Sequence, residues 1–188
     1  EWERYWDDIS GEPLGQEGVR QARKEEMEEF RKHGVYTKVP LTECWVKTGK
    51  APIGTRWVDI NKGDKVHKEY RSRLVAKEIN VKKRDDLFAA TPPLEAKKML
   101  FSFAVTEGIG YTRGKEHEGM KLDFIDVRRA YFHAKARRQI YVSLPAEDKE
   151  EGMCGLLLKS MYGTRGAAQN WEMEYSEFMQ KIGFNRGM

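Results

Sequence analysis

The stretch LDFIDVRRAYFHA, residues 122–134, constrains the fold most strongly, because an apolar run ends there on a carboxylate. Apart from its two aspartates, the segment KLDFIDV (121–127) is apolar on both faces, which predicts a strand near the centre of a sheet. Asp126 would then lie at the end of a buried strand. A carboxylate that has lost its water is costly unless it is paired or coordinates a cation. Asp126 is therefore expected to have a specific partner.

Two interpretations of Asp126 follow from the residue types. Oxygen ligands suit Mg²⁺, which takes one or two carboxylates together with substrate phosphates. Two such ions about 4 Å apart can clamp the attacking and leaving oxygens of a phosphoryl transfer. Alternatively, Asp126 caps the turn that follows it or pairs with Arg128 or Arg129, because aspartate is common at such turns.

Charge is distributed unevenly along the 188 residues, although the formal net charge is only +4. Residues 1–30 hold ten acidic and four basic residues, whereas residues 54–84 hold ten basic and four acidic ones. Residues 121–138 hold six basic and two acidic residues. This distribution predicts a basic groove that faces a polyanion. Solvated charge on an ordinary surface is the simpler alternative.

The cysteines indicate the cellular environment of the protein, and the first residue bears on whether the chain is whole. Cys44 and Cys154 are far apart in the sequence and form neither a disulfide framework nor a paired zinc spacing, which indicates a reducing, intracellular environment. We find no run of about 20 apolar residues and no signal peptide, so we expect no membrane association. The first residue is not Met, so we expect a piece of a longer chain.

Hydrophobic periodicity and turn residues predict an α+β or mixed α/β fold. Helices are expected over 19–33 and 94–108, and a last one should carry an apolar stripe from Ala168 to Ile182 and end at Gly183, with Trp171 in the core on that stripe. A hairpin is expected over 55–77, with Gly63 in its turn at positive φ. Further strands are expected over 35–40, 121–127 and 139–145, and a loop over 87–93, while the segment 155–163 is apolar and turns at Gly163. Residues 1–17 are expected to form an irregular arm anchored by Trp2, Tyr5 and Trp6.

Six segments carry a resemblance to a known family. They are EEMEEFRKHGVYTKVP, IGTRWVDINKGD, EYRSRLVAKEI, DDLFAATPPLEA, IDVRRAYFHAKARRQIYVSLP and KSMYGTRGAAQNW. In this order and at this spacing they resemble the reverse transcriptase of copia-type LTR retrotransposons, the RNA-dependent DNA polymerase domain of a Pol polyprotein. The resemblance covers roughly residues 20–185. It implies an α+β fingers–palm fold, with an N-terminal arm at 1–17, the fingers and connecting helix at 18–120, and a partial palm at 121–188.

The resemblance also implies an activity and its residues. The reaction would be two-metal nucleotidyl transfer onto a primer 3′-hydroxyl, with Mg²⁺ or Mn²⁺ as cofactor. Asp126 would be the catalytic carboxylate and would bind the metal together with the carbonyl of Val127. The nucleotide would be bound by Lys62, Lys65, Arg71, Arg73, Tyr131, Tyr162 and Gly163, and the nucleic acid by Arg128 and Arg129.

Elementary chemistry fits several of these roles. Arginine suits the triphosphate because its planar fork meets phosphate oxygens with two hydrogen bonds. The ring of Tyr131 would exclude a 2′-hydroxyl and so favour deoxynucleotides, and glycine at 163 allows the backbone to approach the substrate. A plain core aromatic is the alternative for Tyr131, and a solvated hairpin tip is the alternative for Lys62 and Lys65.

One element of the family pattern is missing. No Asp-Asp pair follows Gly163, and we therefore expect that the sequence stops before the second catalytic palm strand of the family. One carboxylate cannot hold two metals, and we expect the chain alone to be inactive. The expected partners are an RNA or DNA primer–template, deoxynucleotide triphosphates and the missing C-terminal half of the polymerase, inside the cell in a cytoplasmic particle, the nucleus or both. A non-catalytic nucleic-acid-binding remnant and a degenerate transposon relic remain as alternatives.

Overall fold

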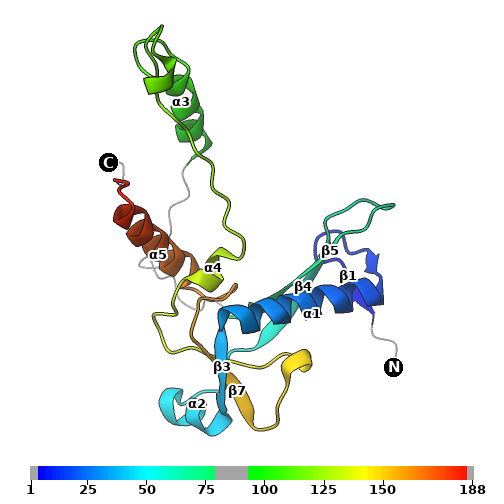
Figure 1. Cartoon of the computed structure of the whole chain (residues 1–188). Helices are drawn as coiled ribbons and strands as arrows, with labels where there is room; N and C mark the ends of the chain where they lie inside the picture. Colours follow the sequence, from blue (N-terminus) through cyan, green and yellow to red (C-terminus); the bar gives the residue numbers. More distant parts are fainter. Residues whose placement is uncertain (1–3, 79–92, 186–188) are drawn as a thin grey trace. The chain divides into compact units, whose positions relative to one another are not determined.

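A computed structural model describes residues 4–78 and 93–185 of the chain (Figure 1). The chain divides into two compact units. The main unit comprises residues 1–88 and 129–188, and the small unit comprises residues 89–128. Helices and antiparallel strands are both present, which agrees with the mixed α/β class expected from the sequence. The expected loop over 87–93 lies, except for Pro93, outside the described residues.

The helix α1 (Gln16–His33) is the longest element of the main unit. Its buried side chains include Val19, Ala22, Met27 and Phe30, which recur at helical spacing and form one apolar face. The helix ends at Gly34, which takes a left-handed conformation with φ of 58°. The expected helix over 19–33 is therefore confirmed, with one additional turn at its start.

The hairpin consists of β4 (Thr55–Asn61) and β5 (Tyr70–Ala76), which pair antiparallel as expected. Leu74 and Ala76 of β5 share a core with Met27 and Phe30 of α1, so the helix covers one face of the hairpin. The expected positive φ at Gly63 is wrong. The turn is a longer loop, residues 62–69, and the Asn61 side chain closes it by accepting hydrogen bonds from the backbone N–H groups of Gly63 and Glu69 at 3.1 and 2.8 Å.

A second sheet has the strand order β3-β7-β6, formed by β3 (Tyr36–Pro40), β7 (Met153–Leu157) and β6 (Tyr141–Val142). Both neighbouring pairs are antiparallel. The strands expected over 35–40 and 139–145 are confirmed as elements, although β6 is short, and β7 includes the first residues of the apolar segment 155–163. Two further elements flank the sheet, α2 (Leu41–Thr48) and the 3₁₀ turn η3 (Ala146–Asp148).

The core of the main unit joins residues that are far apart in the sequence. Side chains from α1 and the hairpin pack with others from the second sheet and from the short helix α4 (Ala130–His133). Phe132 of α4 and Met161 are fully buried, and the ring of Phe132 lies edge-on to Phe30 at a centroid distance of 4.7 Å. This packing places the segment after residue 129 against α1 and β5.

The N-terminal arm is more regular than expected. It contains a small antiparallel ladder of β1 (Tyr5–Trp6) and β2 (Pro13–Leu14). The backbone N–H of Asp8 donates to the carbonyl oxygen of Asp59 in β4 at 2.9 Å. In return, the backbone N–H of Asp59 donates to the Asp8 carboxylate, also at 2.9 Å. The arm thus covers an edge of the hairpin that would otherwise offer unpaired backbone groups.

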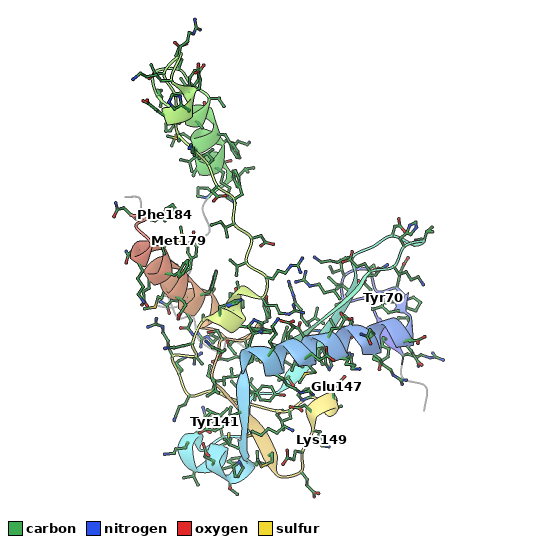
Figure 2. The ribbon with its side chains drawn as sticks, in the orientation of Figure 1. Tyr70, Tyr141, Glu147, Lys149, Met179 and Phe184 are labelled. Carbon is green, nitrogen blue, oxygen red and sulfur yellow. The ribbon has the colours of Figure 1, made fainter. Side chains whose placement is uncertain are left out.

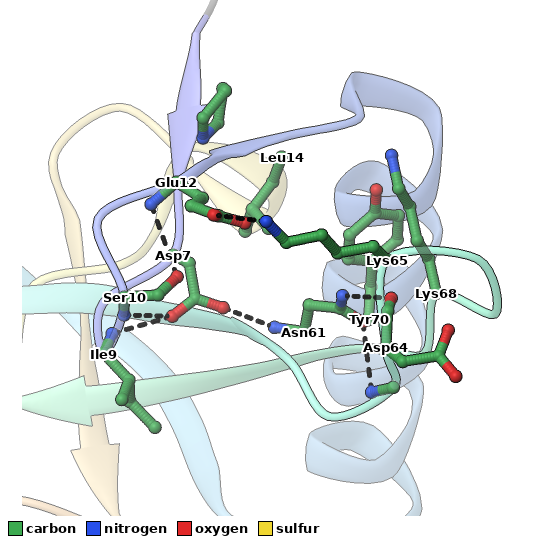
Figure 3. Close-up of a pocket in the computed structure, with 12 residues that line it drawn as sticks. Asp7, Ile9, Ser10, Glu12, Leu14, Asn61, Asp64, Lys65, Lys68 and Tyr70 are labelled. Carbon is green, nitrogen blue, oxygen red and sulfur yellow. Dashed lines mark hydrogen bonds and ion pairs between the residues drawn. The ribbon is translucent and has the colours of Figure 1, made fainter.

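Only part of the expected anchoring of this arm is observed. Tyr5 is buried, whereas the Trp6 side chain is 53% exposed, so Trp6 is not an anchor. Trp2 lies outside the described residues. Asp7 strengthens the contact, because its carboxylate accepts a hydrogen bond from the backbone N–H of Asn61 at 2.7 Å (Figure 3). Backbone hydrogen bonds of this kind lower the pKa of Asp7.

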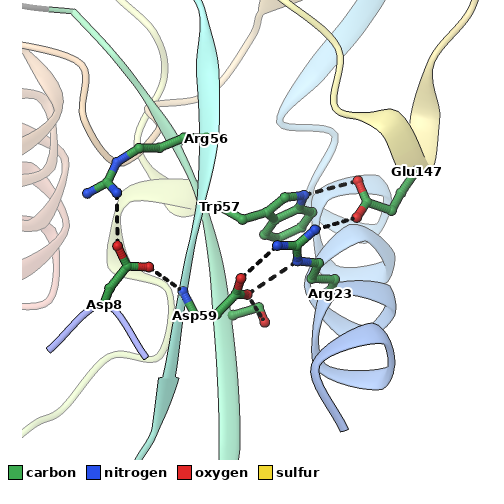
Figure 4. Close-up of polar contacts among 7 residues, drawn as sticks. Asp8, Arg23, Arg56, Trp57, Asp59 and Glu147 are labelled. Carbon is green, nitrogen blue, oxygen red and sulfur yellow. Dashed lines mark hydrogen bonds and ion pairs between the residues drawn. The ribbon is translucent and has the colours of Figure 1, made fainter. Parts of the chain in front are cut away.

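A polar network around Arg23 ties α1 to the hairpin and to η3 (Figure 4). The Arg23 guanidinium donates to both carboxylate oxygens of Asp59, at 2.7 and 3.3 Å, and to Glu147 at 3.3 Å. The indole N–H of Trp57 donates to the same Glu147 at 3.0 Å, and the hydroxyl of Ser72 donates to Asp59 at 2.6 Å. The buried charge of Asp59 is therefore fully paired.

The last helix, α5 (Ala167–Lys181), occurs where the sequence predicts it, but its apolar stripe is largely exposed. Ala167 is its only residue that is fully buried. Trp171 is half-buried, so the expectation that it belongs to the core is wrong. Figure 2 shows Met179 and Phe184 at the far end of this segment, away from Tyr141 of β6. Phe178, in the last turn of α5, is 59% exposed, and Ile182 just after the helix is 54% exposed.

The small unit contains α3 (Leu94–Ala104) and the 3₁₀ turn η2 (Glu116–Glu118). The helix was expected, but it ends at Ala104 rather than at Gly108, and none of its residues is buried. No helix in the described ranges is both long and apolar enough to cross a membrane.

The strand expected over 121–127 is not formed, and that prediction is wrong. A strand needs a hydrogen-bonded neighbour, and none of the described strands pairs with this segment. Its apolar side chains are correspondingly open, with Phe124 71% and Ile125 61% exposed. Phe124 stacks on Phe101 of α3 at a centroid distance of 5.4 Å, which is a contact within the small unit.

Candidate functional site

Four of the residues singled out in the sequence form one group, here called the arginine–tyrosine cluster: Arg71, Arg73, Tyr131 and Tyr162. The guanidinium carbon of Arg73 lies 4.9 Å from the centre of the Tyr162 ring. The Tyr131 and Tyr162 rings are 4.8 Å apart between centroids. The cluster therefore combines cations with aromatic faces that attract them.

Strand alternation explains how β5 presents the two arginines. Ser72, Leu74 and Ala76 are buried, whereas Arg71 and Arg73, which alternate with them along the strand, are only partly buried. Successive side chains of a strand point to opposite faces. The face of β5 that does not serve the core is thus the one that carries both guanidinium groups.

Tyr162 is held in the cluster by its backbone. Its carbonyl accepts a hydrogen bond from the N–H of Ala76, the last residue of β5, at 2.8 Å. Gly163 follows with φ of 80°, and an added Cβ would overlap the carbonyl oxygen of Ala76. Only glycine combines this left-handed conformation with so close an approach. The turn at 162–163 is therefore fixed directly on the strand that carries the arginines.

The hydroxyl of Tyr162 remains a neutral donor at physiological pH. Burial raises its pKa, and this effect exceeds the opposing influence of Arg73 and Arg71. A protonated phenol can donate a hydrogen bond to an anionic oxygen, and the arginines supply the charge.

Sequence reasoning missed Glu26, which lies on the inner side of α1. Its side chain is buried, and Oε2 accepts a hydrogen bond from Nε of Arg129 at 3.1 Å. A signal was present in the sequence, because Glu26 falls on the apolar stripe four residues after Ala22 and four before Phe30. An acid on such a stripe predicts a buried carboxylate with a specific partner.

Arg129 is in an unusual backbone conformation. It is the only non-glycine residue of the described ranges with positive φ, at 50°, and it directly precedes α4. Its Nη1 also lies 3.7 Å from Glu29. The predicted role of Arg129 in nucleic-acid binding stays a prediction, and the contacts observed here are to two carboxylates of α1.

The two lysines that were predicted to bind the nucleotide lie at the tip of the hairpin. Lys62 and Lys65 are exposed, and Lys65 Nζ is 3.5 Å from the carboxylate of Glu12 in the N-terminal arm. Lys65 lines a pocket of about 500 Å³ between the arm and the tip, which also contains Asp7 and Asp64 (Figure 3). That these lysines close over phosphates stays a prediction.

Asp126, Val127 and Arg128 belong to the small unit. Asp126 is exposed, so the expectation of a carboxylate at the end of a buried strand is wrong. No group of three or more His, Cys, Asp or Glu side chains that could hold a metal ion occurs within 4–78 and 93–185.

Comparison with known proteins decides the family. A family model described as reverse transcriptase (RNA-dependent DNA polymerase) matches residues 42–188, well over half of the chain. The chain belongs to the reverse transcriptase family. This reverse transcriptase chain is also 29% identical over 170 residues to the Retrovirus-related Pol polyprotein from transposon TNT 1-94 of Nicotiana tabacum. The predicted resemblance to a retrotransposon reverse transcriptase is thus confirmed.

The chain corresponds to only a small part of the tobacco polyprotein. The alignment covers 86% of this chain but only 12% of the tobacco polyprotein. No solved structure matches the chain. The arginine–tyrosine cluster includes residues from β5 to Tyr162, all inside the region that the family model covers.

Proposed function

We propose that this reverse transcriptase chain binds the incoming deoxynucleoside triphosphate of an RNA-directed DNA polymerase, and that the arginine–tyrosine cluster is the binding site. The observation that carries the proposal is the convergence of Arg71, Arg73, Tyr131 and Tyr162 within a chain of this family. The guanidinium groups would bind the phosphates, and the Tyr131 ring would lie under the sugar, where it excludes a 2′-hydroxyl.

The polymerase reaction would be attack of a primer 3′-hydroxyl on the α-phosphorus. The new bond joins the 3′-oxygen to phosphorus, the bond to the bridging oxygen of the β-phosphate breaks, and pyrophosphate leaves. In such a transfer the protein contributes mainly positioning and charge neutralisation. Arg71 and Arg73 would neutralise the leaving phosphates, while Tyr162 and Gly163 would fix the floor of the site.

Asp126 has a separate proposed role. With the carbonyl of Val127 it would contribute to a site for Mg²⁺ or Mn²⁺, and the ion would supply charge stabilisation when bound. A single carboxylate is too little for two ions, so we propose that the chain alone does not polymerise DNA. Arg128 and Arg129 are proposed to contact the primer–template.

The proposal is tested by calorimetric titration of the chain with a deoxynucleoside triphosphate. Arg73→Ala should weaken binding about ten-fold or more, because a charge-assisted hydrogen bond contributes about 1.5–3 kcal/mol. Arg113→Ala is the matched control, since it removes the same charge from an exposed position in the small unit. Equal affinities for Arg73→Ala and the wild type would refute the nucleotide site.

The uneven charge distribution favours one other function, a nucleic-acid-binding remnant without catalysis. Such a chain would bind RNA or DNA with an affinity that falls steeply with salt, because phosphate contacts release counterions. If the chain binds single-stranded RNA in this manner and shows no affinity for the triphosphate, the remnant replaces the polymerase part as the proposed function.

A further inference from the structure

Glu26 has an electrostatic environment that the proposed nucleotide site does not yet explain. Its side chain is only 5% exposed, and while Oε2 pairs with Arg129, the other oxygen, Oε1, is buried with no hydrogen-bond partner among the described residues. A buried carboxylate with one unsatisfied oxygen is costly. Its retention needs a reason other than the packing of α1.

The helix α1 packs against β5, the strand that carries Arg71 and Arg73, through Met27 and Leu74, and Arg129 of the segment before α4 also reaches Glu26. Arg129 is in direct contact with it, and the charges of Arg73 and Arg71 also act on it. Arg73 lies over the ring of Tyr162, and the charge of Glu26 helps to raise the pKa of the Tyr162 hydroxyl. Glu26 is therefore the buried negative charge at the edge of the arginine–tyrosine cluster.

We propose that Glu26 is an internal counter-ion that neutralises the arginines of the cluster in the free protein and competes with a bound polyphosphate for them. This inference rests on the proposed function, because it assumes that Arg71 and Arg73 bind phosphates. The ligand class is a linear polyphosphate, either free or as the tail of a nucleotide.

Three guanidinium groups close together repel one another, and a fixed carboxylate offsets this repulsion while the site is empty. When a polyphosphate arrives, the same carboxylate repels it, so binding is weaker than the arginines alone would give. Glu26 thus weakens the hold of the arginines on a phosphate product and lets it leave more readily.

The test is a calorimetric titration of the whole chain with inorganic tripolyphosphate at pH 8. Glu26→Gln keeps an oxygen that can accept the Arg129 hydrogen bond but removes the charge. We expect it to bind tripolyphosphate about three- to ten-fold more tightly than the wild type, as the loss of one partly screened repulsion predicts. Glu28→Gln removes the same charge from an exposed position of α1 and should leave the affinity unchanged.

Two further variants keep the proposal falsifiable. Glu26→Met removes the charge with a side chain of similar volume, so it replaces the glutamine variant if that one does not fold, and it should give the same gain. In an Arg73→Ala background the gain from Glu26→Gln should shrink, because one of the competing guanidinium groups is gone. Circular dichroism and the melting temperature establish that each variant is folded.

The outcomes separate this inference from the proposed function. If Arg73→Ala alone leaves tripolyphosphate binding unchanged, the nucleotide site itself fails. If Arg73→Ala weakens binding but folded Glu26→Gln or Glu26→Met binds no more tightly than the wild type, only the counter-ion role is overturned. A gain for Glu28→Gln equal to that for Glu26→Gln would also overturn it, because the effect would then reflect net charge.

Discussion

Replacing Gly163 by alanine should destabilise the main unit far more than a glycine substitution on open surface. Gly163 has φ of 80°, and a side chain in this left-handed region costs about 1 kcal/mol. The added Cβ would also overlap the carbonyl oxygen of Ala76, which belongs to β5 and cannot rotate away as a side chain can.

The overlap with the Ala76 carbonyl costs more free energy than the backbone strain at positive φ. To relieve the overlap, the turn must move off β5, which disrupts the hydrogen bond from Ala76 N–H to the Tyr162 carbonyl at 2.8 Å. Overpacking and the loss of this hydrogen bond together cost about 2–3 kcal/mol. Gly163→Ala should therefore lower the free energy of unfolding by about 3–4 kcal/mol.

Gly152→Ala is the matched control. Gly152 has φ of 69°, but nothing lies within 4 Å of an added Cβ, so only the backbone strain of about 1 kcal/mol should appear. Urea denaturation followed by circular dichroism measures both variants. If the two substitutions destabilise the chain equally, the close approach of Gly163 to Ala76 has no energetic importance and the reasoning is refuted.

Three other perturbations have defined outcomes. Asp59→Ala should cost about 3 kcal/mol in urea denaturation, because it leaves Arg23 with Glu147 alone and leaves the buried Ser72 hydroxyl without its acceptor; a loss below about 1 kcal/mol would show that the network is not rigid. Lys65→Ala should change stability by less than about 0.5 kcal/mol, since its ion pair is exposed, and a larger loss would mean that the hairpin tip depends on it. Burial raises the pKa of Glu26 above its ordinary value of 4.5, although Arg129 and the two arginines of the cluster act to lower it. The folded state therefore holds the proton of the Glu26 carboxyl group more tightly than the unfolded chain does. Stability relative to Glu26→Gln should therefore fall as the pH rises from about 4.5 through the raised pKa and then level off, and parallel curves for the two proteins would contradict the shift.

Sequence patterns predicted the elements whose partners lie close by. The helix α1 and the hairpin have internal hydrogen bonds, an apolar stripe and clear turn residues, so local propensity was sufficient. The segment 121–127 failed because its apolar composition says only that it can be buried, and not which strand would pair with it. In the described ranges it has no such partner, and Phe124 and Ile125 remain exposed.

In the candidate site, too, the sequence identified some residues and missed another. Motif spacing selected Arg71, Arg73, Tyr131 and Tyr162, and the structure places them together. Glu26 was overlooked, because an acid in a charged helix is usually solvated, and its burial depends on Arg129, more than a hundred residues away in the chain. Contacts of such long range cannot be derived from local periodicity.

The Arg23 network has a practical consequence for the limits of this folding unit. The family match begins at residue 42, yet Arg23 lies before that point and joins β4 to η3 across more than 80 residues of sequence. A protein cut at the family boundary would lose this bridge together with Met27 and Phe30, and would expose Leu74 to solvent. We expect such a fragment to precipitate, so anyone who expresses this polymerase segment should begin upstream of Tyr5.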